Sequence, residues 1–123
     1  LLGRDSVCIN TGGEKVFAEE VESVVRSHPA VFDAVVCGRP SPRWGQEIVA
    51  IAALRPGEAL SLDELVTHTR ARLADFKAPK ALVLVGRVLR SPSGKADYAW
   101  ARSVASGDSS PVATDGPTGG PTG

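Results

Sequence analysis

The stretch that decides the fold is residues 31–54, VFDAVVCGRPSPRWGQEIVAIAAL. Its two ends, residues 31–37 and 47–54, are rich in β-branched side chains and nearly continuous in apolar ones. Such runs are typical of strands in a sheet that is covered by helices. The segment between them, residues 38–46, contains two prolines and two glycines and predicts a turn-rich connection. The sequence therefore predicts two buried strands separated by turns.

The residues before this stretch predict a hairpin followed by a helix. Two short strands, residues 6–10 and 14–17, flank Gly12 and Gly13. Adjacent glycines mark backbone that needs positive φ or that must let another group approach closely. Apolar residues then recur at helical spacing over residues 18–26, so we expect an amphipathic helix there.

The residues after the central stretch predict two more helices and one more strand. Ser61 and Glu64 form a capping box for a helix over residues 62–73. A strand is expected over residues 80–85, and a last short helix over residues 97–103. The whole order predicts an α+β fold, a small mixed three-stranded sheet with packed helices and an edge β-hairpin.

The chain of 123 residues has room for one domain. Residues 107–123 are rich in Gly, Pro and Ser, so we expect a folded domain over residues 1–106 and a flexible tail after it. The 14 basic and 14 acidic residues exclude a strongly basic nucleic-acid binder and a polybasic membrane anchor. The longest apolar run, residues 48–54, is too short to span a bilayer. The chain opens on Leu1 and is interpreted as a piece of a longer protein.

The cysteines and histidines predict no metal site and no histidine catalysis. Cys8 and Cys37 each lie in an apolar stretch, so we expect two buried free thiols and a reducing, cytoplasmic location. The spacing of the Cys and His residues is not that of a zinc site. His28 and His68 suit cap and surface roles better than catalysis.

Three loop segments carry polar or charged residues that packing does not require: residues 12–15, 75–80 and 91–95. Lys95, on a Ser-Pro-Ser-Gly loop, can deliver its ammonium group to another site and stabilise charge on a phosphoryl or carboxyl oxygen. The alternative is a solvated lysine in a turn. A P-loop is rejected, because Ala96 follows Lys95 where a Walker A motif needs Ser or Thr.

The other two loop segments also have two interpretations each. Residues 76–80 combine an aromatic ring with two ammonium groups, which together can stack a base and neutralise phosphates. The alternative is a helix end with lysines that favour the dipole and a proline that stops the helix. The Gly12-Gly13 turn alone indicates a simple hairpin. Trp44 suits a loop anchor or a partner contact.

Taken in order, these segments resemble the C-terminal domain of the adenylate-forming enzymes, the superfamily of acyl-CoA synthetases, peptide-synthetase adenylation domains and luciferases. The resemblance covers residues 1–106. It rests on a hinge-and-hairpin motif, an intervening pattern and a terminal lysine motif, which match at Gly3-Arg4, Ile9, Gly13, residues 18–22, 28–31, 75–80 and 93–95. Residues 7–16 look most like actinobacterial fatty-acid and steroid-side-chain CoA ligases.

The resemblance implies an AMP-forming ligase that works in two steps. A carboxylate and ATP give an acyl-adenylate and pyrophosphate, and the CoA thiol then displaces AMP. ATP, CoA and Mg²⁺ are implied, with the Mg²⁺ ligands in a larger N-terminal adenylate-binding domain of the same chain. The substrate would be a small-molecule carboxylic acid, and the small domain would rotate between the steps. This chain alone is expected to be inactive.

For the first step, the resemblance implies that Lys95 is catalytic and reaches the substrate carboxylate and the α-phosphate of ATP. Arg4 would lie near the nucleotide ribose. The hinge is implied at Asp5 or Ser6, since the family's hinge position falls on Ser6 with Asp5 beside it.

For the second step, the resemblance implies a CoA site. Gly12 and Gly13 would line the pantetheine tunnel, Phe76 would pack near the CoA adenine, and Lys80 would meet the CoA phosphates. Ala78 stands at a position that looks like Arg in some relatives, so a phosphate contact from there is missing.

Two alternatives remain beside the CoA ligase. One is an adenylation domain that hands its acyl group to a carrier protein, for which Phe76 and Lys80 would be less needed. The other is a binding or interaction module without chemistry, which predicts that Lys95 tolerates any substitution.

Overall fold

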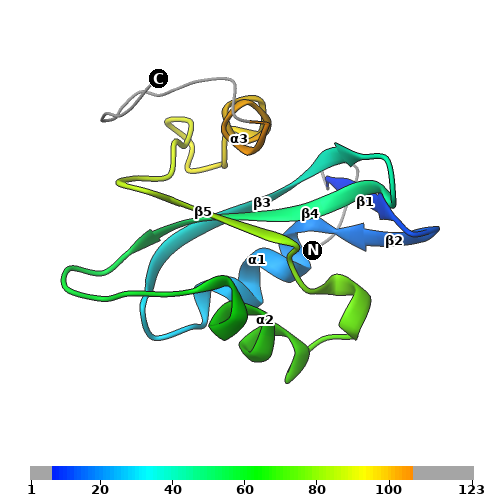
Figure 1. The fold of residues 1–123 in the computed structure, drawn as a ribbon. Helices are drawn as coiled ribbons and strands as arrows, with labels where there is room; N and C mark the ends of the chain where they lie inside the picture. The colour runs from blue at the N-terminus through cyan, green and yellow to red at the C-terminus, as the bar shows by residue number, and fades with distance from the viewer. Residues whose placement is uncertain (1–6, 107–123) are drawn as a thin grey trace.

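The structure is a computed structural model that describes residues 7–106 (Figure 1). The helices and strands follow the predicted order, with one added 3-10 turn: β1 (Cys8–Thr11), β2 (Glu14–Phe17), α1 (Ala18–Arg26), β3 (Val31–Ser41), β4 (Gly45–Leu54), α2 (Leu62–Arg70), η1 (Asp75–Lys77), β5 (Ala81–Val85) and α3 (Tyr98–Ala105). The predicted tail over residues 107–123 lies outside the described residues, and so do Arg4, Asp5 and Ser6.

The sheet is mixed, and β4 is its central strand. Strand β3 pairs antiparallel with β4, and β5 pairs parallel with it. The β1–β2 hairpin joins the sheet at one position, where Thr11 pairs with Gly45. The prediction of a mixed three-stranded sheet with an edge hairpin is confirmed.

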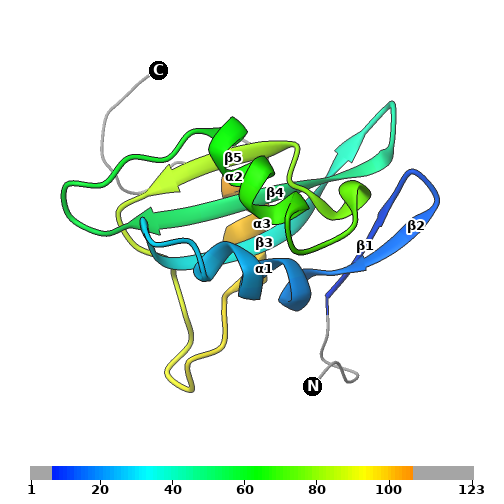
Figure 2. The same ribbon diagram turned by 90° about the horizontal axis from the view of Figure 1, so that it is seen from below.

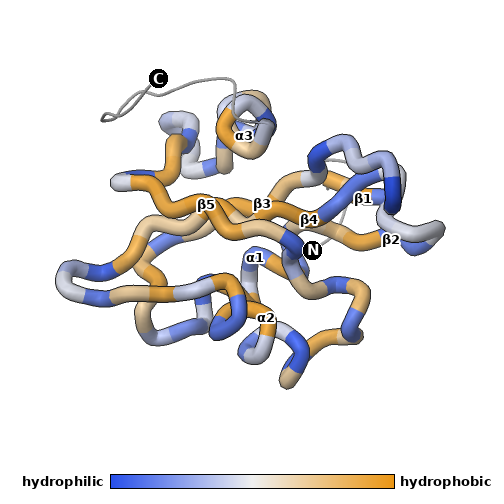
Figure 3. Tube along the Cα trace, in the orientation of Figure 1, coloured by the Kyte–Doolittle hydropathy of each residue, from blue (hydrophilic) through white to orange (hydrophobic). Residues whose placement is uncertain are grey.

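Helices cover both faces of the sheet. Helices α1 and α2 lie on one face and α3 lies on the other, as two views at right angles show (Figures 1 and 2). The apolar runs of β3 and β4 serve both layers because successive side chains of a strand point to opposite faces. On β4, Ile48, Ala50 and Ala52 join the cluster with α1 and α2, whereas Val49, Ile51 and Ala53 join the cluster with α3. The hydrophobic colour therefore runs through the middle of the sheet, while the hairpin end is hydrophilic (Figure 3).

The central strands are longer than the sequence analysis expected. Strand β3 continues to Ser41 and β4 begins at Gly45, so the turn-rich segment shrinks to residues 42–44. Pro40 is accommodated because β3 is an edge strand: among the described strands it pairs with β4 alone. A proline has no backbone N–H to donate, and at an edge no second strand needs that donor. Helix α2 keeps its predicted capping box but ends at Arg70 instead of Leu73.

Both cysteines are free, as predicted, but only Cys37 is buried. The expectation that both thiols are buried is wrong for Cys8. Strand β1 turns alternate side chains toward the core, and its inward positions are Ile9 and Thr11, so Cys8 lies on the outer face.

Candidate functional site

Lys95 lies at the end of a closed turn between β5 and α3. The Gly94 amide donates to the Ser91 carbonyl at 2.8 Å, and the Ser91 amide donates to the Lys95 carbonyl at 2.8 Å. The Lys95 amide in turn donates to Ser91 Oγ at 3.3 Å. The Lys95 side chain itself is exposed. A flexible cationic side chain thus starts from a backbone that is held by its own hydrogen bonds.

Arg90 ties this turn to the sheet. Its guanidinium donates to both carboxylate oxygens of Asp33, at 2.9 and 2.6 Å, and to the Gly94 carbonyl at 3.0 Å. Asp33 belongs to β3, next to a break in the pairing register between Val31 and Asp33. The hydrogen bond from Arg90 lowers the pKa of the Asp33 carboxyl below its ordinary value, so the pair stays charged at neutral pH.

A second anchor holds the segment that follows Lys95. Tyr98 Oη donates to Glu22 Oε2 at 2.5 Å, and the Val36 amide donates to the same oxygen at 3.1 Å. Glu22 belongs to α1 and is 4% exposed, and this burial raises the pKa of its carboxyl. The segment that carries Lys95 is therefore fixed to the β3 edge before the turn and to α1 after it.

The predicted Gly-Gly turn is a hairpin with both central φ angles positive, 58° at Gly12 and 86° at Gly13. The two glycines differ in what surrounds them. The Gly12 amide donates to the Trp44 carbonyl at 2.8 Å, and a Cβ atom at Gly12 would lie 3.2 Å from Trp44 Cε3. A Cβ atom at Gly13 would meet nothing within 4 Å. The expectation of positive φ is confirmed at both glycines, and that of a close approach at Gly12.

Trp44 brings two of the predicted site residues together. Lys80 Nζ lies 5.0 Å from the centre of the Trp44 ring. Gly12 lies beside the same ring, where a Cβ atom would meet it. The guanidinium of Arg43 lies 5.1 Å from the same ring centre. The Lys80 amide donates to the Ile48 carbonyl at 2.8 Å, which fixes this residue just before β5. We call Gly12, Arg43, Trp44 and Lys80 the tryptophan cluster.

Phe76 lies on η1, four residues before Lys80 in the chain. Phe76 is 39% exposed, and Lys77 Nζ lies 5.8 Å from the centre of its ring. Lys77 also pairs with Glu20 of α1 at 2.7 Å, which ties η1 to the first helix. An open groove of about 400 Å³ between α2 and residues 75–80 reaches Lys80. Aromatic faces beside ammonium groups can stack a base and bind phosphates.

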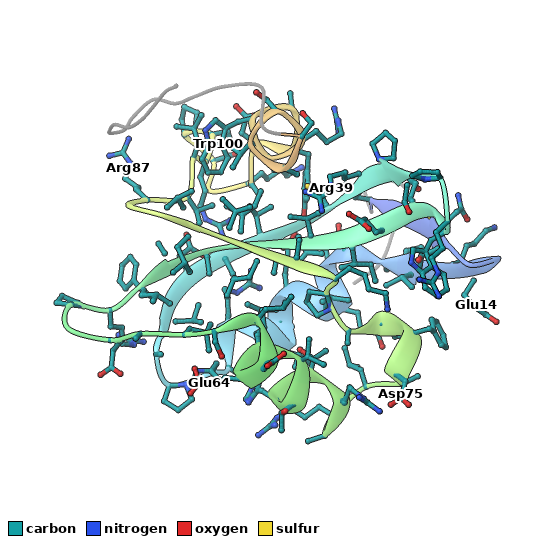
Figure 4. All side chains as sticks on the ribbon, in the orientation of Figure 1. Glu14, Arg39, Glu64, Asp75, Arg87 and Trp100 are labelled. Carbon is teal, nitrogen blue, oxygen red and sulfur yellow. The ribbon has the colours of Figure 1, made fainter. Side chains whose placement is uncertain are left out.

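The predicted site residues thus form two separate groups. The Lys95 turn and the hairpin with the tryptophan cluster lie at different ends of the domain in both views (Figures 1 and 2). Figure 4 shows Glu14 at the hairpin tip pointing outward, and Arg39 between the sheet and α3. Arg4, Asp5 and Ser6, predicted near the nucleotide and at the hinge, lie outside the described residues.

Two kinds of feature are absent from residues 7–106: a cluster of metal ligands and a helix that could span a membrane. Over residues 7–106, no three His, Cys, Asp or Glu side chains gather to form a metal site. No helix in the same range is long and apolar enough to cross a membrane.

The anchors of the Lys95 turn and the role of Trp44 could not be read from the sequence to the same degree. Arg90 and Asp33 are 57 residues apart, and no local pattern relates them. Trp44 carried a usable signal, because a large aromatic residue between Pro42 and Gly45 has to be held by something nearby.

The fold is that of a segment of acyl-CoA synthetases. The crystal structure of Brucella canis acyl-CoA synthetase matches with a TM-score of 0.77 and 29% identity, over 84% of this chain and 20% of that chain. Residues 20–95 match the family of AMP-binding enzyme C-terminal domains, and the chain belongs to this family. The resemblance to the C-terminal domain of adenylate-forming enzymes is confirmed.

Named relatives share much of the sequence. The chain is 62% identical over 105 residues to medium-chain acyl-CoA ligase Mig of Mycobacterium avium, covering 85% of this chain and 19% of that protein. It is 53% identical over 102 residues to a 3-oxocholest-4-en-26-oate–CoA ligase of Rhodococcus rhodochrous, covering 83% of this chain and 18% of that protein. The chain therefore spans about a fifth of the length of the curated relatives it matches.

Proposed function

We propose that the chain serves as the mobile C-terminal domain of an AMP-forming acyl-CoA ligase. The enzyme would convert a carboxylic acid, ATP and CoA into acyl-CoA, AMP and pyrophosphate. The observation that carries the proposal is the presence of two separate cationic sites on one domain, the Lys95 turn and the tryptophan cluster. The names of the relatives support a fatty acid or a steroid side-chain acid as the substrate class.

In the first step, a carboxylate oxygen of the substrate attacks the α-phosphorus of ATP, and the bond to pyrophosphate breaks. The Lys95 ammonium group would neutralise the charge that develops on the carboxylate and phosphoryl oxygens. The Mg²⁺ ligands and most of the ATP pocket belong to the larger domain in this proposal, with Arg4 near the ribose.

In the second step, the CoA sulfur attacks the acyl carbonyl carbon, and the bond to AMP breaks. The hairpin around Gly12 and Gly13, which bear no side chains, would leave room for the thin pantetheine arm. Lys80 would bind CoA phosphates, and Phe76 would pack near the adenine. Trp44 is added to this site because its ring lies 5.0 Å from Lys80 Nζ and where a Cβ atom at Gly12 would meet it.

The distance between the two sites supports a rotation between the steps. Both are attached to one sheet at different ends of it (Figure 2), so a single docked orientation would present one of them to a fixed reaction centre. A hinge at Asp5 or Ser6 would allow the exchange. A cytoplasmic location completes the proposal, since two free thiols suit a reducing compartment.

The test joins residues 1–106 to the preceding part of ligase Mig, in place of the matching segment. Adenylation is assayed as pyrophosphate release from carboxylate and ATP, and thioester formation is assayed from preformed acyl-adenylate and CoA. We expect the chimera to carry out both half-reactions. We expect Lys95→Ala to lower adenylation by a factor on the order of a hundred or more, while thioester formation survives.

The alternatives give different results in the same assays. An adenylation domain that serves a carrier protein would pass its acyl group to a phosphopantetheinyl carrier protein and would leave CoA unacylated. A binding module would leave both half-reactions unchanged in Lys95→Ala. The 123-residue chain alone is expected to form no thioester, and measurable turnover by it would contradict the proposal.

A further inference from the structure

We propose that Arg90 and Asp33 are positioning residues that hold the Lys95 turn in the orientation required for adenylation. The inference rests on the proposed function of Lys95 and extends it to two residues outside the lysine motif. Arg90 is the only one of the two that touches the turn; Asp33 acts through it.

The contacts of Arg90 bridge two parts of the fold. Two of its nitrogens fork onto Asp33 of β3, and a third bond reaches the Gly94 carbonyl, one residue before Lys95. A guanidinium offers several donors in a fixed plane, so it can hold the carboxylate and the carbonyl at the same time. The rigid sheet therefore determines where the backbone of Lys95 lies, although its side chain is flexible.

The need for such an anchor follows from the rest of the turn. The backbone bonds between Ser91, Gly94 and Lys95 and the contact between the Ser91 and Ser93 hydroxyls lie within the turn, so these bonds fix its shape without fixing its direction. The anchor at Tyr98 comes three residues after Lys95, beyond Ala96 and Asp97. Without Arg90, the closed turn can tilt as a unit about the β3 edge. A shift of about 1 Å in a catalytic group can cost on the order of a hundredfold in rate.

The chain offers a closely matched control in the Arg39–Glu47 pair. Arg39 also forks onto one carboxylate and also donates to a backbone carbonyl, that of Ala105 at 2.9 Å. The side chains are exposed to 31% and 20% in this pair, against 28% and 21% for Arg90 and Asp33. Arg39→Gln therefore removes a comparable pair that contacts α3 instead of the Lys95 turn.

The kinetic test uses the Mig chimera. We expect Arg90→Gln to lower the kcat of adenylation by about ten- to a hundredfold, with less than about a threefold change in thioester formation. Arg39→Gln is expected to leave both within about threefold. In the Lys95→Ala background, Arg90→Gln should cause no further loss, because a residue that acts through another has no effect once that residue is gone.

Two conservative variants separate position from charge and from misfolding. Arg90→Lys keeps the positive charge but replaces the fork by a single ammonium group, so we expect adenylation to stay at least about fivefold low. Asp33→Asn keeps the shape of the side chain but removes the ion pair with Arg90. It should lower adenylation, as Arg90→Gln does. Urea unfolding of the 123-residue chain should show similar losses of stability in Arg90→Gln and Arg39→Gln, because the two ion pairs are similarly exposed, so a loss of adenylation confined to Arg90→Gln is not a loss of folding.

The results separate the positioning role of Arg90 from the proposed catalytic role of Lys95. Any of three results would overturn the positioning role. These are full adenylation activity in Arg90→Lys, a further loss of adenylation when Arg90→Gln is added to Lys95→Ala, and equal losses of adenylation in Arg39→Gln and Arg90→Gln. If Lys95→Ala abolishes adenylation while Arg90→Gln has no effect, the positioning role fails and the proposed function stands. If Lys95→Ala has no effect on adenylation, both fail.

Discussion

The two glycines of the hairpin allow a test of the tryptophan cluster in which each variant is the control of the other. Both have positive φ, 58° at Gly12 and 86° at Gly13. Alanine in this region costs roughly 1–2 kcal/mol, so either substitution should lower the free energy of unfolding by about that amount. Only at Gly12 does the new Cβ atom meet a neighbour, Trp44 Cε3 at 3.2 Å.

That contact is shorter than the roughly 3.5–4.0 Å at which two carbon atoms pack best, so the Trp44 ring has to move in Gly12→Ala. Overpacking of this kind costs about 1 kcal/mol or more. The same ring borders Lys80, so the displacement should reach the proposed CoA site. A cost of about 1 kcal/mol corresponds to about a fivefold rise in the KM for CoA.

The assay measures urea unfolding of the chain and CoA-dependent thioester formation in the Mig chimera. We expect both variants to lose stability and to narrow the proposed pantetheine tunnel, and Gly12→Ala to raise the KM for CoA about fivefold more than Gly13→Ala does, with adenylation unchanged in each. Equal effects of Gly12→Ala and Gly13→Ala on the KM for CoA would refute the reasoning, because both variants add a Cβ atom to the hairpin but only the one at Gly12 meets the Trp44 ring.

Two further predictions concern the fold. A thiol reagent should label Cys8 rapidly in the native chain and Cys37 only after unfolding, since burial raises the pKa of the Cys37 thiol to about 11; rapid double labelling would contradict the register of β3. Stability should fall as the pH drops below about 6.5, because burial lowers the pKa of His68 and the unfolded chain then binds more protons. Urea unfolding between about pH 5 and about pH 8 measures this, and a slope unchanged in His68→Gln would contradict it.

Most of the fold could be predicted because its signals are local. The apolar runs of β3 and β4, the capping box at Ser61 and the paired glycines each specify a structure within a few residues. The ends of β3 and β4 could not be predicted in the same way. Pro40 indicates a turn when only the sequence is considered. It is compatible with a strand because β3 lies at the edge of the sheet.

The candidate site was predictable to a lesser degree. Motif spacing singled out Lys95, Gly12, Phe76 and Lys80, and the structure adds that Gly12 and Lys80 meet at Trp44. The anchors of the Lys95 turn depend on contacts across the sheet, which no spacing rule in one sequence provides.

The edge of β3 explains why the Lys95 turn is held where it is. An exposed edge leaves backbone groups ready to pair with a foreign strand, and proteins commonly cover such groups. Here the Val36 amide donates to Glu22, and the Ala34 carbonyl accepts from Arg26 and Arg90, each at 3.4 Å.

Two of these side chains also hold the segment that carries Lys95. Arg90 binds the Gly94 carbonyl, and Glu22 binds the Tyr98 hydroxyl. Covering the edge and orienting the turn are therefore achieved by the same side chains. A substitution at Arg90 removes one donor from the Ala34 carbonyl and releases the turn at the same time, whereas a substitution at Lys95 leaves the edge covered. The two variants should consequently differ in their tendency to aggregate, even where both lose adenylation.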